Sequence, residues 1–187
     1  MLLKKFPAIA DSLLAVAAGA DASRAQTYLP GIDVSHWQGS INWNSVAGDG
    51  IKFAFMKATQ GNSYVDPTFA TNIANATAAG VKVGPYHFCD LDTDTNNPLD
   101  PVNEANHFLD VIKPYYDTGL YLPPVADVEG FPAFSSTAEA RTFTSSWVQS
   151  FSDTVYDSLG VRPIIYTSLS KANSYYTSSI ASQHELW

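Results

Sequence analysis

Short apolar segments alternate with longer amphipathic segments along the chain after residue 30. The apolar segments have the length and composition of strands, and they cover residues 31–36, 51–58, 81–88, 123–130 and 161–168. The amphipathic segments indicate helices at residues 66–80, 100–116 and 137–160. Asp66 and Pro67 suit a helix start, while Gly80 and Gly160 suit helix ends.

Strands that are separated by helices of this length predict βαβ units and a mainly parallel sheet. Gly-rich phosphate loops of the G-x-G-x-x-G and G-x-x-x-x-G-K types do not occur, which disfavours an open dinucleotide-binding sheet. We therefore predict a modified TIM-like β/α barrel. A complete barrel of this kind usually needs about 250 residues. Leu186 and Trp187 resemble the start of a further strand, so we expect the barrel to be incomplete.

Charge and cysteine content exclude several classes of function. The formal net charge is −8 at pH 7, which argues against binding to nucleic acid or to an anionic membrane surface. The single cysteine, Cys89, excludes an internal disulfide and reads as a small buried apolar residue. His36 and His87 follow strands, but no H-x-H or H-E-x-x-H spacing accompanies them. We expect no metal and no organic cofactor.

The first 25 residues read as an address label rather than as part of the domain. Lys4 and Lys5 precede an apolar stretch, and small residues follow around positions 20–25, as in a secretion signal. The alternative is a disordered extension ahead of the domain. We expect residues 1–25 to be the signal and residues 26–187 the catalytic domain. That domain would be extracellular or periplasmic, monomeric and free of membrane association.

Two carboxylates lie two residues apart in the strand-like stretch "PPVADVEG". Asp127 and Glu129 share one face of that strand, about 6–7 Å apart. At this distance their repulsion is roughly 2–3 kcal/mol, enough to keep one carboxyl group protonated near neutral pH. A protonated acid beside an ionised one is what glycosidic cleavage requires. The alternative is an exposed strand end with two solvated acids.

A third acid and several aromatic residues also follow strands. Because the carboxyl ends of parallel barrel strands converge, we expect Asp33 to meet Asp127 and Glu129 there. Strand-end side chains that could contact a sugar, or could simply be core or rim residues, are Tyr86, Tyr166, Trp37 and His36.

Five segments occur in the order "GIDVSHWQGSINW", "FAFMKATQGNSYVDPTF", "AGVKVGPYHF", "PPVADVEG" and "RPIIYTS". Together they resemble glycoside hydrolase family 25, the Chalaropsis-type lysozymes. The resemblance implies a modified β/α barrel that hydrolyses the β-1,4 bond between N-acetylmuramic acid and N-acetylglucosamine in peptidoglycan. It implies that Glu129 is the general acid. Asp127 would orient the acetamido group or stabilise positive charge at the anomeric carbon, and Asp33 would be a further acid at the floor of the groove.

Two departures from the family pattern bear on function. Gln60 stands where the family commonly has Glu, which removes a charge from a position expected to contact substrate. The family also continues past "LW" with further strands, so the chain could instead be a peptidoglycan-binding module with little or no turnover. A chitinase-like carbohydrase is disfavoured, because "LPPVADVE" lacks the earlier acids of the D-x-x-D-x-D-x-E pattern.

Overall fold

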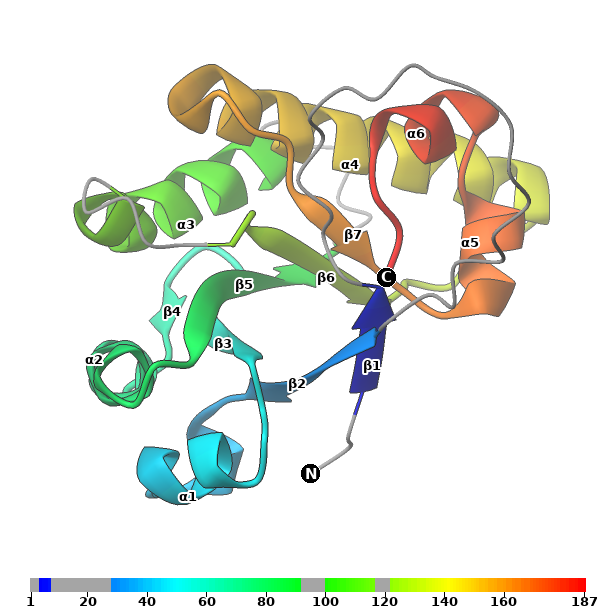
Figure 1. The fold of residues 1–187 in the computed structure, drawn as a ribbon. Helices are drawn as coiled ribbons and strands as arrows, with labels where there is room; N and C mark the ends of the chain where they lie inside the picture. Colours follow the sequence, from blue (N-terminus) through cyan, green and yellow to red (C-terminus); the bar gives the residue numbers. More distant parts are fainter. Residues whose placement is uncertain (1–3, 8–27, 92–99, 117–121) are drawn as a thin grey trace, which may run out of the picture.

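A curved sheet organises the chain in the computed structural model, which describes residues 4–7, 28–91, 100–116 and 122–187 (Figure 1). Its strand order within these residues is β1-β2-β3-β5-β6-β7, and β4 pairs with β3. The strands are β1 (Lys4–Pro7), β2 (Tyr28–Val34), β3 (Phe53–Gln60), β4 (Tyr64–Val65), β5 (Lys82–Asp90), β6 (Val125–Gly130) and β7 (Ile164–Tyr166). The series from β2 through β3, β5 and β6 to β7 is parallel, whereas β1 and β4 are antiparallel to their neighbours. The predicted mainly parallel sheet of an incomplete barrel is confirmed.

Helices follow one another around the outside of the sheet (Figure 1). They are η1 (His36–Gln38), α1 (Trp43–Gly48), α2 (Phe69–Ala78), α3 (Asp100–Tyr116), α4 (Thr137–Leu159), α5 (Leu169–Tyr175) and α6 (Ser178–Gln183). The helix predicted at residues 66–80 begins only at Phe69, because Asp66 instead closes a turn by accepting from the backbone N–H of Thr68 at 2.9 Å. The short helices α1, α5 and α6 were not predicted, since six or seven residues show too little periodicity.

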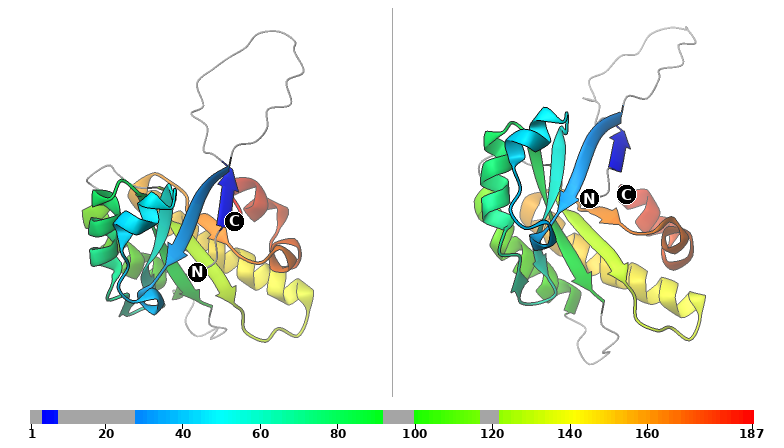
Figure 2. Two further views of the ribbon diagram at one scale, coloured as in Figure 1. Left: turned by 60° about the horizontal axis from the view of Figure 1, so that its bottom comes forward. Right: turned by 90° about the horizontal axis from the view of Figure 1, so that it is seen from below.

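The two edges of the sheet are built differently (Figure 2). At one edge Lys4–Pro7, part of the expected secretion signal, pairs with residues 28–31 of β2. The rest of that expected signal lies outside the described residues, and so does the expected domain boundary at residue 26. At the other edge, Leu186 forms a parallel bridge with Ile165 of β7, as its strand-like sequence predicts. None of the described helices is both long and apolar enough to cross a membrane.

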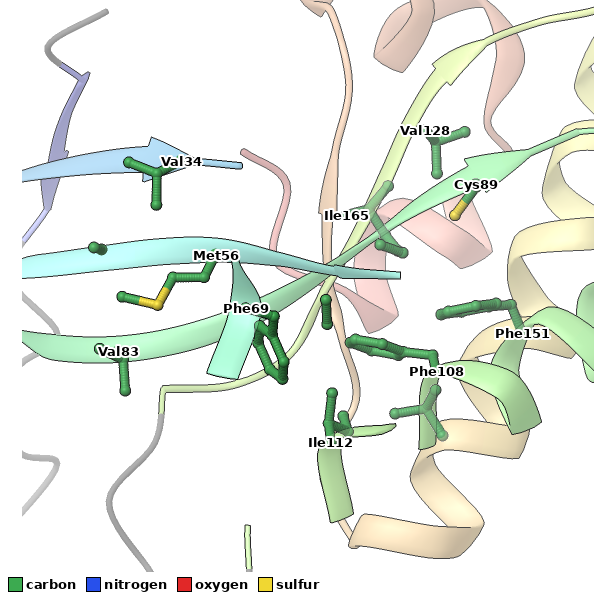
Figure 3. Packing of buried hydrophobic residues seen from close by; sticks show 14 of the residues in the cluster. Val34, Met56, Phe69, Val83, Cys89, Phe108, Ile112, Val128, Phe151 and Ile165 are labelled. Carbon is green, nitrogen blue, oxygen red and sulfur yellow. The ribbon is translucent and has the colours of Figure 1, made fainter. Parts of the chain in front are cut away.

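The convex face of the sheet carries the main apolar core (Figure 3). Side chains alternate along each strand, so Met56 of β3, Val83 of β5 and Val128 of β6 all point outward to the helices. There they join Phe108 of α3 and Phe151 of α4, both with no exposed surface. This packing fixes the strands from outside and leaves their other face for chemistry.

The concave face carries a smaller cluster around Phe53, Phe55 and Val125. Gly31 of β2 and Gly84 of β5 make room for the two phenylalanines, because a Cβ at either glycine would overlap a ring of β3. Trp187 covers this face at the chain's last residue, with its ring centroid 5.0 Å from that of Phe55. The concave cluster therefore packs β3 and β6 against the C-terminal residue Trp187 on this face of the sheet.

Candidate active site

A small pocket lies on the concave face at the carboxyl ends of the strands. It is lined by Asp33, Tyr86, Val125, Asp127, Tyr166 and Trp187. Each lining strand residue follows from the two-residue alternation that also places Phe53 and Phe55 inward. Parallel pairing sets Asp127 beside Tyr166 of β7 and Phe88 of β5. The structure thus brings together Asp33 and Asp127, which are 94 residues apart in the chain.

Glu129 lies beyond this pocket, at the exposed end of β6. Asp127 is half-buried, but the last two residues of β6 are exposed. Pairing with β7 stops at Asp127, so the strand extends past its neighbour and its final side chains reach solvent. Glu129 therefore lies at an exposed strand end, which the sequence analysis gave as the alternative for both acids, whereas Asp127 is half-buried. The predicted role of Glu129 as general acid is a separate matter and stays a prediction.

The Tyr86 hydroxyl interacts electrostatically with both pocket acids, Asp127 and Asp33. Burial raises the pKa of the Tyr86 hydroxyl, and the negative charges of Asp127 and Asp33 raise it further. A hydrogen bond with the Ser35 side chain acts in the opposite direction but does not cancel the rise in pKa. The phenol therefore keeps its proton at neutral pH and can donate it to an acceptor in the pocket.

Gln60, predicted to contact substrate, bridges two charged side chains at the rim instead of projecting freely. Its amide oxygen accepts from Lys57 Nζ at 2.6 Å, and its amide nitrogen donates to Asp90 Oδ1 at 3.2 Å. Lys57 was missed by the sequence analysis. The signal was present, because it is the one charged residue in the apolar stretch "FAFMKAT" and shares the strand face of Phe53 and Phe55.

His36 and Trp37 lie on η1, directly after β2. Trp37 is 81% exposed, and its ring centroid is 4.6 Å from that of His36. His36 Nδ1 lies 2.8 Å from Asp66 Oδ2 and 3.0 Å from the Tyr64 hydroxyl, which holds the imidazole in place. Trp37 therefore presents an open aromatic face on a fixed support, outside the pocket that Asp33 and Asp127 line.

His87 lies on the opposite face of the sheet from the pocket, between the rings of Phe108 and Phe151. Its Nδ1 is 2.7 Å from Thr59 Oγ1 and its Nε2 is 2.7 Å from Glu104 Oε2. Burial lowers the pKa of His87 to about 3. Cys89 lies close to this pair, within the 4.8 Å that a shared metal ion would need. Since both ring nitrogens already serve hydrogen bonds, the arrangement is that of a buried polar network.

Residues 32–187 match the family described as Glycosyl hydrolases family 25. Lysozyme M1 of Streptomyces globisporus is 39% identical over 126 residues, which are 65% of this chain and 40% of that protein. The N,O-diacetylmuramidase of Chalaropsis sp is 30% identical over 143 residues, 73% of this chain and 64% of that protein. The chain thus spans less than two thirds of these relatives.

Solved structures agree with this match over a larger share of the chain. The bacterial lysozyme from Streptomyces coelicolor superimposes with a TM-score of 0.67 at 30% identity, covering 85% of this chain and 72% of that one. A family 25 glycosyl hydrolase from Bacillus anthracis gives a TM-score of 0.72 at 25% identity, covering 92% and 75%. The family match over residues 32–187 includes all the residues that line the pocket.

Proposed function

Because this chain belongs to glycosyl hydrolases family 25, we propose that it is a lysozyme that cuts peptidoglycan glycan strands. The bond cleaved is the β-1,4 link between N-acetylmuramic acid and N-acetylglucosamine. The observation that carries the proposal is the convergence of Asp33 and Asp127 on one pocket with Tyr86, Tyr166 and Trp187. Carboxylates, phenols and an indole in one groove provide the charge, hydrogen bonds and stacking surface that a glycan needs.

Glu129 is the general acid in this proposal. It donates a proton to the glycosidic oxygen as the bond to the anomeric carbon breaks, so the leaving sugar departs as an alcohol. The oxygen of a water molecule ends up on the anomeric carbon, and the proton that this water releases completes the balance. The exposed position of Glu129 at the end of β6 suits this role, because water can return the proton after each turnover. Asp127 lies two residues away on the same strand face, so both carboxyl groups can act on one bound sugar.

Asp127 and Asp33 face the sugar ring. Positive charge develops at the anomeric carbon in the transition state, and a half-buried carboxylate stabilises it more than one in bulk water. Asp127 alternatively orients the acetamido group of the sugar. Tyr86 keeps its proton between these two acids and donates to a sugar oxygen.

Residues around the pocket hold the rest of the glycan. Tyr166 lies beside Asp127, with its ring held edge-on by Trp187 at 4.9 Å between centroids. Trp37 stacks on a sugar ring at the rim, with His36 as its support. Gln60 contacts substrate only if a hydrogen bond to the glycan replaces its bond to Lys57 or its bond to Asp90.

The substrate places the protein outside the cytoplasm, so we also propose that it is secreted through the signal in residues 1–25. It acts as a monomer on peptidoglycan, without a metal or organic cofactor. These statements rest on the sequence and on the chemistry of acid-catalysed glycoside cleavage, which needs only carboxyl groups.

The test is product analysis of purified peptidoglycan after incubation with the full chain. We expect mass spectrometry to detect soluble fragments with N-acetylmuramic acid at their reducing ends. Glu129→Gln removes the acid but keeps the shape of the side chain, so release should fall at least about 100-fold. Asp157→Asn makes the matching carboxyl-to-amide change at an exposed acid of α4, outside the pocket, and should release fragments at the parent rate.

Two results would contradict the proposal. Fragments that end in N-acetylglucosamine would mean that a different bond is cut. No release by the folded parent chain would remove the enzymatic function. In that case, co-sedimentation with insoluble peptidoglycan would distinguish the alternative, a peptidoglycan-binding module, from a chain that does not recognise peptidoglycan.

A further inference from the structure

Lys57 places a positive charge next to the catalytic strand. It lies on β3, where its Cα pairs with that of Tyr86, a pocket residue. The ammonium nitrogen lies 4.8 Å from the ring centroid of Phe88, and Phe88 is the strand partner of Asp127. The Lys57 charge therefore reaches the groove at the level of Asp127.

The ammonium group of Lys57 is removed from bulk water. Lys57 is only 8% exposed, and the rings of Phe88 and Tyr64 cover its nitrogen on two sides. Burial lowers the pKa of Lys57, while Asp66, Asp127 and Asp90 act in the opposite direction, in that order. Lysine is almost never buried in this way without charges that compensate for the loss of hydration.

Gln60 orients the ammonium group of Lys57 through a hydrogen bond. It stands between Lys57 and Asp90, with its amide oxygen towards the ammonium and its amide nitrogen towards the carboxylate. A neutral amide orients the ammonium without neutralising it, which a carboxylate at the same position would do. The positive charge of Lys57 therefore still attracts the carboxylate of Asp127 in the pocket.

The far end of this bridge is anchored in the core. The backbone N–H of Asp90 donates to Glu104 Oε2 at 3.1 Å, and the same oxygen lies 2.7 Å from His87 Nε2. Glu104 has no exposed surface and belongs to α3. The position of Gln60, and with it that of Lys57, is therefore tied to the rigid outer layer of the fold.

We propose that Lys57 is a positioning residue for glycan cleavage: its ammonium group, held by Gln60, keeps Asp127 in the carboxylate form. The inference rests on the proposed lysozyme function and adds the source of the charge that separates the roles of Asp127 and Glu129. With Lys57 present, the carboxylate form of Asp127 is favoured, which suits the charge-stabilising role proposed for it.

Other charged and titratable groups lie on the elements around Asp127. The charge of Asp127 raises the pKa of Tyr86 and Cys89 on β5 and of Tyr176 after α5. The other groups are Asp33 on β2, Tyr64 on β4, Asp66 after β4, Asp90 on β5, Glu129 on β6 and Tyr166 on β7. The acids among them oppose ionisation of Asp127, and the phenols carry no charge at neutral pH. Of the groups named as acting on Asp127, Lys57 is the one whose charged form is positive and favours the carboxylate.

The test is a titration of the Asp127 carboxyl carbon by ¹³C NMR in the full chain, with the resonance assigned through Asp127→Asn. We expect Lys57→Met to raise the titration midpoint by about one pH unit. Gln60→Glu should raise it in the same direction, because it neutralises Lys57 and leaves its packing in place. Lys57→Arg keeps the charge and should shift the midpoint little. Lys52→Met, the same change at an exposed lysine before β3, should not shift it.

The acid limb of the pH profile of kcat/KM should move upward with the midpoint in Lys57→Met and in Gln60→Glu. An unchanged midpoint in both variants would overturn the proposal and leave Lys57 a structural residue. If Lys57→Met does not fold, Gln60→Glu decides alone. The NMR midpoint does not depend on turnover, so a parent chain that releases no fragments would refute the proposed function without affecting this test.

Discussion

The carboxylate of Asp66 joins two separate parts of the chain. Its Oδ2 accepts from the backbone N–H of His36 at 3.0 Å, and its Oδ1 accepts from the hydroxyl of Thr68 at 2.7 Å. Burial favours the protonated form of Asp66, but the hydrogen bonds from His36 and Thr68 outweigh it and lower the pKa. One acid thus fixes η1, which carries Trp37, to the start of α2.

Replacing Asp66 should therefore cost stability in a pH-dependent way. We expect Asp66→Ala to lower the free energy of unfolding by about 2 kcal/mol at pH 7. Because the folded-state pKa is lowered, the carboxylate stabilises the fold above the unfolded-state pKa of about 3.9. That contribution is lost as the pH falls through the folded-state value.

Urea denaturation at pH 7 and at pH 2.5 measures this effect. The difference between the parent chain and Asp66→Ala should shrink at the lower pH. Asp110→Ala, at an exposed position of α3, should change the free energy of unfolding by less than about 0.5 kcal/mol at either pH. A penalty for Asp66→Ala that is equal at both pH values would show that lost packing, rather than lost charge, is the cause.

At the scale of elements, α4 has a defined cap at each end. The Ser136 side chain accepts from the backbone N–H of Glu139 at 3.1 Å, and Gly160 ends the helix with a φ of 71°. Its backbone N–H donates to the carbonyl of Tyr156 at 2.8 Å. A left-handed residue is needed for this ending, and glycine adopts it without steric cost.

Gly160→Ala should lower the free energy of unfolding by about 1 kcal/mol, because an alanine side chain is strained at positive φ. Gly48→Ala is the matched control, since Gly48 lies in α1 without a positive φ and with open space around it. It should be neutral or stabilising by up to about 1 kcal/mol. Thermal melts of the two variants distinguish them, and similar shifts would argue against backbone strain at Gly160.

The approach of β5 to β3 depends on Gly84. A Cβ at this position would lie 2.6 Å from Cε1 of Phe55 and 3.1 Å from Cβ of Leu122. Phe55 also packs against Trp187, which lines the pocket. A methyl group at position 84 would therefore push on the Phe55 ring, which in turn contacts Trp187 in the pocket.

We expect Gly84→Ala to destabilise the fold by about 1–3 kcal/mol through overpacking, and to slow fragment release by displacing Trp187. Phe55→Leu removes the overlap, so the double variant should be more stable than the sum of the two single effects predicts. Chemical denaturation of the four chains gives this interaction energy. Strictly additive effects would mean that Phe55 is not the residue that yields.

At the scale of the whole molecule, charge opposes binding to the proposed substrate. The chain carries a formal net charge of −8, and cell walls with attached anionic polymers are negative as well. Long-range forces therefore repel the protein from the wall, and binding depends on short-range contacts in the groove and on the rim.

Salt should consequently speed the reaction on such walls. Raising the ionic strength from about 0.01 M to about 0.15 M shortens the Debye length from ~30 Å to ~8 Å and screens the repulsion. We expect kcat/KM to rise over this range on walls that keep their anionic polymers. The rise should be smaller on peptidoglycan stripped of them. A rate that falls with salt on both substrates would indicate an attractive basic surface and contradict this account.

The sequence by itself determined the parallel sheet and the positions of its long helices. The apolar run "IKFAFMKA", the two-residue spacing of the acids in "PPVADVEG" and the start and end signals around the helix at residues 137–160 are all local properties. The two-residue spacing put Asp127 and Glu129 on one face of their strand. The strand-like sequence at Leu186 indicated a further strand, which its bridge to Ile165 confirms.

Tertiary structure alone decided how these groups interact. Glu129 is exposed because the pairing between β6 and β7 ends at Asp127. Where it ends depends on the length of β7, which the sequence of β6 does not contain. The charge environment of Lys57 arises from Asp66, Asp90 and Asp127, which lie on other segments of the chain. Solvation and Coulomb interactions depend on distance in space, which local sequence patterns do not encode.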